Sequence, residues 1–244
     1  TLSRHKTIKI NNISTIASRA TLGYNSSHME NKNTKNGHLI MASADIGNGA
    51  DLPSRSLDAL RDSNLLIFEE DRPARRFLKA AGITRNYLKL NEHKNNLVLE
   101  DARTALKKGQ QICYMSDQGT ACLADPGVDL LKLAESLGTK VTVIPGPSSV
   151  SAAISACPFD CSKFYYVGFP PRKEAERKRF LANAGTTPAA LVIMDTPYRI
   201  KQLLTDCASV FPNRKAVVAL DISGAQEAYW YGKFSTLLKR AEKL

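Results

Sequence analysis

The stretch Gln111-Ile112-Cys113-Tyr114-Met115 is followed at once by Ser116-Asp117-Gln118-Gly119-Thr120, and Ala124-Asp125-Pro126-Gly127 then opens a helical stretch. The mostly apolar first segment predicts a buried strand, and the glycines predict loops whose backbone can approach a ligand closely. A strand, a polar loop and a helix in this order are the repeating unit of an α/β fold.

The same unit recurs along the chain from Gly37 onward. Helical windows of about ten to fifteen residues lie between apolar runs, and one of them places Val128, Leu131, Ala134 and Leu137 on one face before a helix stop at Gly138. Strands joined by crossover helices pair mainly in parallel, so the sequence predicts an α/β protein. The runs expected to be strands are His38–Ala44, Leu65–Phe68, Tyr87–Leu90, Gln111–Met115, Lys140–Ile144, Phe164–Phe169, Ala189–Met194 and Lys215–Leu220.

A stiff turn divides this regular part of the chain. Ile144-Pro145-Gly146-Pro147-Ser148-Ser149 ends one apolar run and leads into a helix of small residues expected at Ser151–Ala156. Two prolines and a glycine suit a domain boundary. We therefore predict one domain over residues 37–147 and a second over 148–244.

Residues 1–36 differ from the rest, since they hold six basic side chains and one acidic one, Glu30. A segment so poor in apolar residues cannot bury enough surface to offset its ordering entropy, so we expect a disordered or extended basic tail. Three interpretations stay open. It is an RNA-binding arm, an organelle-targeting segment, or partly a remnant of cloning around Ser26-Ser27-His28-Met29.

The net charge of the whole chain is +11, which favours a polyanionic partner such as nucleic acid. The five cysteines are an odd number and no secretory leader is visible, which favours a reducing, cytoplasmic location. Cys157 and Cys161 have no second pair to complete a metal site, so we expect no metal and interpret both as buried small hydrophobes. No apolar run reaches the ~20 residues of a membrane span.

Ligands of parallel α/β sheets bind at the carboxyl ends of the strands, so the loops after the apolar runs are the candidate sites. Four such loops are unusual: Asp45-Ile46-Gly47-Asn48-Gly49, Ser116–Thr120, the Pro145–Ser149 turn and Asp195-Thr196-Pro197-Tyr198-Arg199. Taken alone, each is also an ordinary turn. The glycine fingerprints of dinucleotide-binding folds and of P-loop nucleoside triphosphatases are absent from the sequence.

Seven motifs in order carry a resemblance to a known family. They are Ile46-Gly47-Asn48, Glu69-Glu70-Asp71-Arg72 with Arg75-Arg76, Ser116–Thr120, Ala124–Gly127, Pro145–Ser149, Gly168-Phe169-Pro170-Pro171-Arg172-Lys173 and Thr196–Arg199. Over residues 38–230 the chain resembles the tetrapyrrole methylase superfamily, and within it the branch that methylates a cytidine ribose 2′-hydroxyl in small-subunit ribosomal RNA. The resemblance implies two α/β domains, with a mainly parallel N-terminal sheet, a mixed C-terminal sheet and a cleft for S-adenosylmethionine between them.

The resemblance also implies roles for individual residues. Catalytic candidates are Glu69 and His93, because a ribose hydroxyl needs a base or hydrogen-bond acceptor to lose its proton, and beside them Arg72. Substrate-binding candidates are Arg75, Arg76, Arg172 and Lys173. Cofactor-binding candidates are Met115, Ser116, Asp117, Gly119, Thr120, Pro145, Gly146, Ser148, Ser149, Met194 and Ala219. The partners implied are ribosomal RNA or the small ribosomal subunit, and a second copy of the chain in a homodimer.

Several alternatives stay open beside these roles. Glu69 can instead form an ion pair with Arg72 or Arg76, and His93 can simply be solvated. The basic segment 171–179 suits RNA contact and also suits a solvated helix face. Tyr165, Tyr166 and Phe169 could stack on an unpaired base, although strand alternation favours the interpretation that they are core.

The chain departs from the family pattern at Ala121 and Glu70. These departures keep two other functions open. One is a methyltransferase of a tetrapyrrole or another small anionic metabolite, and the other is a catalytically inactive RNA-binding relative.

Overall fold

The computed structural model of the chain describes residues 37–90, 95–123 and 125–242. The predicted tail, residues 1–36, and the catalytic candidate His93 lie outside the described residues. The predicted division of the regular part at residues 147/148 stays a prediction.

Five parallel strands form the first sheet, in the order β3-β2-β4-β1-β5. Strand β1 pairs with β4 on one side and with β5 on the other, so that His38 of β1 lies opposite both Gln111 and Lys140. A strand buried on both faces needs an almost continuous apolar run, which is what the sequence offered for this sheet. The strands are β1 (His38–Ala42), β2 (Leu65–Phe68), β3 (Leu88–Lys89), β4 (Gln111–Met115) and β5 (Lys140–Ile144). The prediction of a parallel sheet is confirmed.

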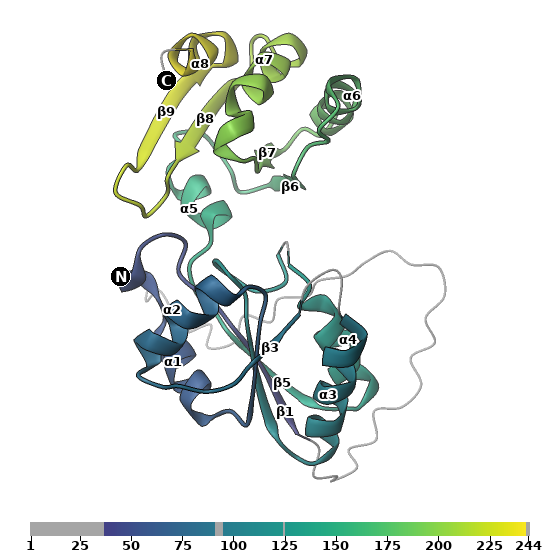
Figure 1. Ribbon diagram of the computed structural model, residues 1–244. Coiled ribbons are helices and arrows are strands. Elements are labelled where there is room, and N and C mark those ends of the chain that lie inside the picture. Colours follow the sequence, from purple (N-terminus) through teal and green to yellow (C-terminus); the bar gives the residue numbers. More distant parts are fainter. Residues whose placement is uncertain (1–36, 91–94, 124, 243–244) are drawn as a thin grey trace, which may run out of the picture. The chain divides into compact units, whose positions relative to one another are not determined.

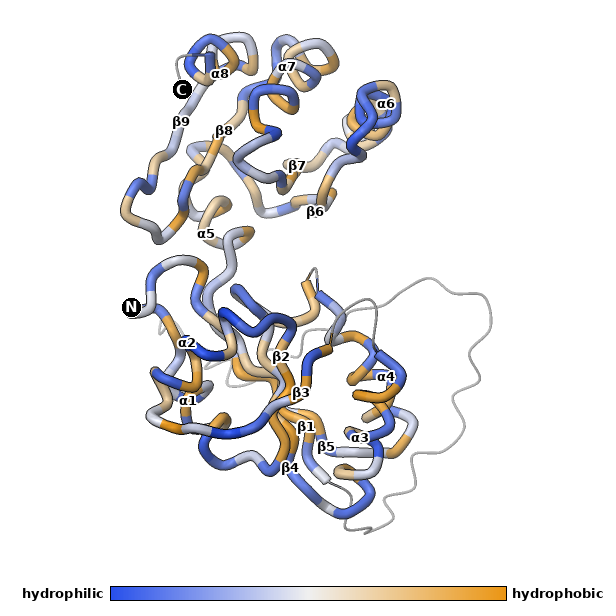
Figure 2. Tube along the Cα trace, viewed as in Figure 1, coloured by the Kyte–Doolittle hydropathy of each residue, from blue (hydrophilic) through white to orange (hydrophobic). Residues whose placement is uncertain are grey.

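Helices cover both faces of this sheet (Figure 1). On one face α1 and α2 pack a core that contains Leu60, Phe68 and Phe77, and on the other α3 and α4 pack a core that contains Leu106 and Tyr114. The tube in Figure 2 shows the strands as the most hydrophobic segments of this part of the chain. The helices are α1 (Ser54–Asp62), α2 (Asp71–Ala81), α3 (Asn95–Lys107) and α4 (Val128–Ser136), with a short 3-10 turn η1 (Gly49–Asp51) before α1.

The buried face of α4 differs from the face that its apolar spacing predicted. Leu130, Leu133 and Ala134 are buried, whereas Val128 is 42% exposed. The helix begins only at Val128, so the first residue of the predicted stripe lies at its N-terminal end, directly after the Asp125–Gly127 turn. The predicted stop is right, since Gly138 has a φ of 60° and follows the last turn.

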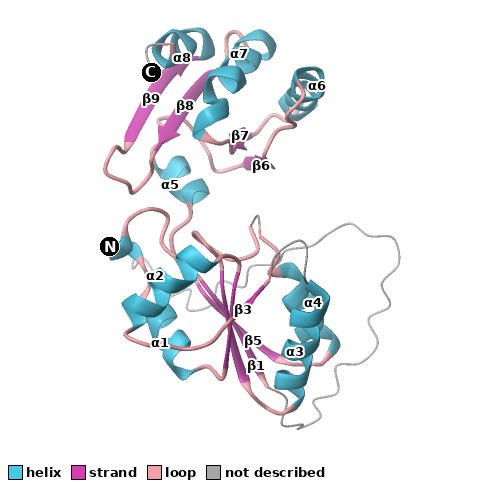
Figure 3. Cartoon of the chain, viewed as in Figure 1, coloured by secondary structure: helices cyan, strands magenta, loops and turns pink. Residues whose placement is uncertain are grey.

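After β5 the chain forms two sheets of two strands each (Figure 3). Strands β6 and β7 pair in parallel, and β8 and β9 pair antiparallel. This part of the chain therefore contains both parallel and antiparallel strand pairing, as a mixed sheet does. The two pairs of strands are not hydrogen-bonded to each other and so form two separate sheets. The elements are α5 (Ser149–Ser155), β6 (Phe164–Gly168), α6 (Glu174–Gly185), β7 (Ala190–Ile193), η2 (Pro197–Arg199), α7 (Ile200–Val210), β8 (Lys215–Leu220), β9 (Ala228–Lys233) and α8 (Phe234–Ala241).

The core of this second part is smaller than that of the first. One cluster holds Leu204, Trp230 and Leu237, and another holds Leu181 and Cys207. Strand β9, which the sequence analysis missed, supplies Trp230. No helix in the described part of the chain is long and apolar enough to cross a membrane.

Two predictions of buried side chains were wrong. Tyr165 and Phe169, expected in the core, are each 48% exposed, and only Tyr166 of the three is half-buried. Cys157 and Cys161, expected to be buried, are also only half-buried. No residue of β6 is buried, whereas four of five are buried in β1 and in β4.

Candidate functional site

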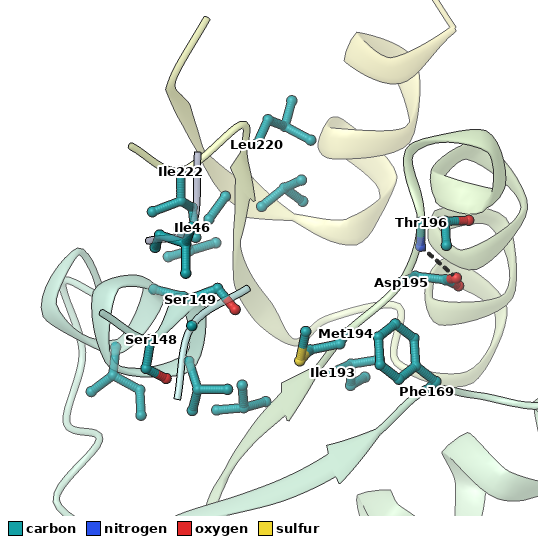
Figure 4. Close-up of a pocket in the computed structure, with 18 of the residues that line it drawn as sticks. Ile46, Ser148, Ser149, Phe169, Ile193, Met194, Asp195, Thr196, Leu220 and Ile222 are labelled. Carbon is teal, nitrogen blue, oxygen red and sulfur yellow. Dashed lines mark hydrogen bonds between the residues drawn. The ribbon is translucent and has the colours of Figure 1, made fainter. Parts of the chain in front are cut away.

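A pocket of about 1260 Å³ lies where most of the loops singled out in the sequence meet. Its lining includes loop residues that follow β1, β2 and β4, the start of α5, and residues of β7 and β8 (Figure 4). The volume is large enough for a nucleoside-sized ligand and part of a second molecule, since pockets for small ligands measure about 300–1000 Å³.

Most of the predicted site residues line this pocket. Those that do are Glu69, Arg72, Arg76, Ser116, Asp117, Gly119, Thr120, Ser148, Ser149, Met194 and Ala219. Those that do not are Met115, Pro145, Gly146, Arg75, Arg172 and Lys173. Met115 is fully buried in the sheet, so only its backbone is available to support the loop that follows it.

Glu69, directly after β2, occupies the wall of the pocket next to Asp117, which follows β4. Its Oε1 accepts a hydrogen bond of 2.9 Å from the backbone N–H of Asp117. Burial, helped by the negative charges of Asp117 and Asp125, raises the pKa of Glu69 to about 7, and that hydrogen bond opposes the rise. A carboxyl group with this pKa exchanges protons readily at neutral pH.

The side chain that holds the Ser116–Gly127 loop in shape is Asp125, which sequence reasoning placed only in a turn. Its Oδ1 accepts hydrogen bonds from the Tyr114 hydroxyl at 2.9 Å and from Gly127 N–H at 2.8 Å. Its Oδ2 accepts one from Cys122 N–H at 2.6 Å. Asp125 thus ties the second half of the loop to Tyr114 of the core strand β4. The one signal of this role in the sequence is a tyrosine in a mostly apolar strand, eleven residues upstream.

Arg76 is paired with Asp45 and not with Glu69. Its guanidinium donates to Asp45 Oδ2 at 2.5 Å and lies 4.5 Å from the centre of the Phe77 ring. The Asp45 side chain is 1% exposed, while that of Arg76 is 47% exposed. The pair offsets the cost of the buried carboxylate and leaves part of the guanidinium facing solvent. The alternative of a Glu69–Arg76 ion pair is therefore wrong.

Gly119 brings two of the loops into contact. Its carbonyl accepts from Ala44 N–H at 2.8 Å, and its own N–H donates to the Asp45 carbonyl at 3.0 Å. Its φ of 68° is a conformation that favours glycine. A Cβ here would lie 3.2 Å from Ile46 and 3.3 Å from the Pro147 carbonyl, so the loops after β1, β4 and β5 pack closely against one another at this glycine.

Two arginines fix the turn Pro170-Pro171-Arg172 in the second part of the chain. Arg199 donates to the Pro170 carbonyl at 2.7 Å, and Arg177 donates to the Arg172 carbonyl at 2.6 Å. Arg177 is itself buried and paired with Asp206 at 2.6 Å. The turn that carries Arg172 and Lys173 is therefore held through its backbone carbonyls, and the side chains of these two residues take no part in these contacts.

A family model described as Tetrapyrrole (Corrin/Porphyrin) Methylases matches residues 38–238, which include the loops described above. The chain belongs to this family. Ribosomal RNA small subunit methyltransferase I of Xylella fastidiosa is 34% identical to it over 202 residues, which are 82% of this chain and 74% of that protein. The protein of the same name from Thermotoga maritima is 28% identical over 85% of this chain and 93% of its own length.

Solved structures share the tetrapyrrole methylase fold. A diphthine synthase has a TM-score of 0.62 at 16% identity, and covers 83% of this chain and 84% of its own. The uroporphyrin-III-C-methyltransferase of Thermus thermophilus has a TM-score of 0.56 at 17% identity, over 85% and 90%. The predicted family resemblance, the α/β fold and the classification as an S-adenosylmethionine-dependent methyltransferase are thereby confirmed.

The residues of this tetrapyrrole methylase suit a nucleoside with a polar tail. Ser148 stands at the N-cap of α5, but its hydroxyl makes no capping hydrogen bond. It lines the pocket together with Ser149, opposite apolar residues such as Leu220 and Met194 (Figure 4). Uncommitted hydroxyls beside an apolar wall are the mixture that small-molecule sites offer.

Proposed function

We propose that this tetrapyrrole methylase transfers a methyl group from S-adenosylmethionine to a ribose 2′-hydroxyl of small-subunit ribosomal RNA. The observation that carries the proposal is Glu69, a carboxyl group with a pKa of about 7 in the wall of the pocket. Relatives named Ribosomal RNA small subunit methyltransferase I support the choice of RNA.

The cofactor would be held by the pocket-lining residues Ser116, Asp117, Gly119, Thr120, Ser148, Ser149, Met194 and Ala219. When bound, S-adenosylmethionine supplies an electrophilic methyl group on sulfur. The protein's part is to hold the acceptor oxygen in line with that group and to exclude water, which can supply several kcal/mol of the barrier.

Glu69 would take the proton of the ribose hydroxyl. The hydroxyl oxygen would form the new bond to the methyl carbon while the bond from that carbon to sulfur breaks and S-adenosylhomocysteine leaves, and the hydroxyl proton would move to a carboxylate oxygen of Glu69. Oε1 accepts a hydrogen bond from Asp117 N–H, so we assign the proton to Oε2. Arg72, also in the pocket wall, would neutralise charge that develops on the acceptor.

Fewer basic side chains of segment 171–179 are available to contact RNA than its sequence indicates. Arg177 is buried against Asp206, and Lys178 bonds to Glu174 at 2.7 Å. Among the described residues, Arg172 has no ion-pair partner within 4 Å, and the only one of Lys173 is Glu176, at 3.4 Å. The Lys173 side chain is 82% exposed. These two residues, with the exposed Arg72 and Arg75, are our candidates for phosphate contacts.

Methyl transfer in vitro tests the proposal. Purified protein and tritiated S-adenosylmethionine are offered small ribosomal subunits or a small-molecule extract, both from cells that lack this gene. We expect label in RNA, at a linkage that resists alkaline hydrolysis because the 2′-oxygen is blocked. Label in the small-molecule extract alone would support the metabolite methyltransferase instead. Failure to bind S-adenosylhomocysteine in a calorimetric titration would remove both enzymatic functions.

We also propose that the protein acts in the cytoplasm as a homodimer. Val141 and Val143 on the edge strand β5 are 39% and 54% exposed, and a second copy would cover them. Light scattering should give twice the chain mass for the wild type and a lower mass for Val143→Lys. A wild-type monomer at micromolar concentration would exclude the dimer.

A further inference from the structure

One oxygen of Asp195 lacks a partner although it is buried. The side chain is 2% exposed, and its Oδ1 accepts from Thr196 N–H at 2.8 Å and lies 3.2 Å from Arg199 Nε. Oδ2 has no hydrogen-bond partner among the described residues. Because an unpaired buried carboxylate oxygen is costly, such an atom in the wall of a pocket calls for a donor on a ligand.

Asp195 stands where ligands of parallel sheets bind. It comes two residues after the end of β7, and Phe169 comes directly after the end of β6, which is β7's parallel neighbour. The two strand ends are joined by a hydrogen bond of 3.0 Å from Met194 N–H to the Gly168 carbonyl. Ligands bind outside the carboxyl ends of such strands, so Phe169 and Asp195 face the same volume.

Phe169 offers a flat apolar face beside this oxygen. Its side chain is 48% exposed, and both it and Asp195 line the pocket. Figure 4 shows its ring beside Ile193 and Met194, with Asp195 on the same wall. A register shift at Tyr166/Gly168 and a φ of 79° at Gly168 turn the chain there and aim Phe169 away from the strand. An exposed ring next to a hydrogen-bond acceptor is how proteins hold an unstacked nucleic-acid base.

Arg199 connects this pair to the candidate RNA surface. The same guanidinium that pairs with Asp195 donates to the Pro170 and Pro171 carbonyls, at 2.7 and 3.2 Å. Those carbonyls belong to the turn that presents Arg172 and Lys173. Asp195, Phe169 and the basic turn are thus one connected piece, which favours an RNA base over the adenine of the cofactor as the occupant.

We propose that Asp195 Oδ2 accepts a hydrogen bond from the exocyclic amine of a target base that stacks on Phe169. The inference rests on the proposed RNA methylation and names how the acceptor nucleotide is chosen. A carboxylate accepts from the N4 amine of cytosine, whereas the O4 of uracil would meet it acceptor to acceptor. Amine-bearing bases are therefore selected and uracil is rejected.

Replacement of Asp195 by Asn tests the inference, because the existing hydrogen-bond donors allow only one orientation of the amide group. Its oxygen must keep the Oδ1 position to accept from Thr196 N–H and Arg199, so its NH₂ group takes the position of Oδ2. The variant then presents a donor where the wild type presents an acceptor. Asp62→Asn, an equal change at an exposed residue of α1 outside the pocket, is the matched control.

The wild-type enzyme first maps the methylated nucleotide on small ribosomal subunits by its resistance to alkaline hydrolysis. Subunits are then reconstituted from transcripts with cytidine or uridine at that position, and kcat/KM is measured on both. We expect Asp195→Asn to lower kcat/KM on cytidine about tenfold or more, in line with the discrimination of a base-specific hydrogen bond, and to raise the uridine-to-cytidine ratio. Asp62→Asn should leave both values unchanged.

Binding of S-adenosylhomocysteine, measured by calorimetry, separates this site from that of the cofactor. We expect its Kd to stay within about twofold in Asp195→Asn, too small a change for a lost hydrogen bond to a charged group. An equal loss on both transcripts, a loss of S-adenosylhomocysteine binding that matches the loss in kcat/KM, or a mapped uridine would each overturn the inference. Absence of any transfer to RNA by the wild type would instead refute the proposed function on which it rests.

Discussion

In β1 and in β4 four of five residues are buried, whereas in β7 none of the four is and in β8 only one of six. The first sheet is covered by helices on both faces, and its inner strands β1, β2 and β4 belong to the core. Residues of β7 and β8 line the pocket instead. The difference shows a division of roles: the first sheet is a fixed support for the polar groups at its strand ends, and the second part contributes an apolar wall that a ligand must complete.

The largest expected effect comes from the same substitution in the two parts. Leu66→Ala in β2 removes a fully buried side chain and should lower the free energy of unfolding by about 2–5 kcal/mol. Leu191→Ala in β7 removes a half-buried side chain from the pocket wall and should cost about 1 kcal/mol. Urea denaturation of both variants measures the difference. Equal losses would mean that β7 is as much a part of the core as β2.

The next effect concerns the polar groups of the first sheet. Glu69→Gln removes the proposed base and should lower kcat by about 10² or more. In the wild type, kcat should rise with pH through about 7, where Glu69 loses its proton, and then level off. The variant should lack this rise. Glu70→Gln, a change of the exposed neighbour of Glu69, is the control and should keep the wild-type profile.

The pH dependence of the free energy of unfolding should report the pKa of Glu69 independently of activity. Because burial raises the pKa of Glu69 above its ordinary value of 4.5, the folded state holds this proton more tightly than the unfolded state. The contribution of Glu69 to stability therefore falls as pH rises from about 4.5 to about 7. Glu69→Gln should lose that part of the decline, as thermal unfolding at several pH values would show. A decline identical to that of the wild type would place the pKa of Glu69 near its ordinary value.

This contrast also explains how far the sequence could predict the structure. Gln111–Met115 and Lys140–Ile144 were placed with the correct bounds. The first is a mostly apolar run buried in the sheet, and the second is an edge strand whose valines flank Thr142. Strand β9 was missed, since only Trp230 of its residues is buried and a half-exposed strand leaves a weak pattern. The exposure of Phe169 could not be predicted either, because it depends on the register shift in β6.

The candidate site was predictable where its residues follow strands, and less so where they act through long-range contacts. Glu69, Asp117 and Met194 could be placed by their positions at strand ends and by family motifs. The bond between Tyr114 and Asp125 joins a strand to a turn, and that between Arg199 and Pro170 joins two turns. Neither has a spacing that a single sequence reveals, so the supporting residues were identified only in the structure.

A smaller effect is expected from the basic turn of the second part. Arg172→Ala with Lys173→Ala should weaken binding to small ribosomal subunits about tenfold at low salt, and should lower the slope of log Kd against log salt by about 2, since each phosphate contact contributes about one unit. Lys107→Ala with Lys108→Ala removes the same charge from exposed residues at the end of α3. Filter binding over a range of salt concentrations measures both pairs. An equal change in the two slopes would mean that total charge, and not this turn, governs binding.

The smallest expected effect distinguishes a displaced Phe169 ring from a general loss of stability. Gly168 in β6 and Gly82 after α2 have φ values of 79° and 68°, and a Cβ at either position would meet no atom within 4 Å. Alanine should therefore cost each about 1–2 kcal/mol of stability, because both force a side chain into the left-handed region. Only Gly168 precedes Phe169 and accepts the hydrogen bond from Met194, so relaxation of its backbone would displace the ring from the pocket wall. We expect the two variants to unfold at similar urea concentrations while Gly168→Ala alone loses kcat/KM on RNA severalfold. If Gly82→Ala lost activity equally, the loss would follow from lowered stability, and the position of Phe169 would have no part in it.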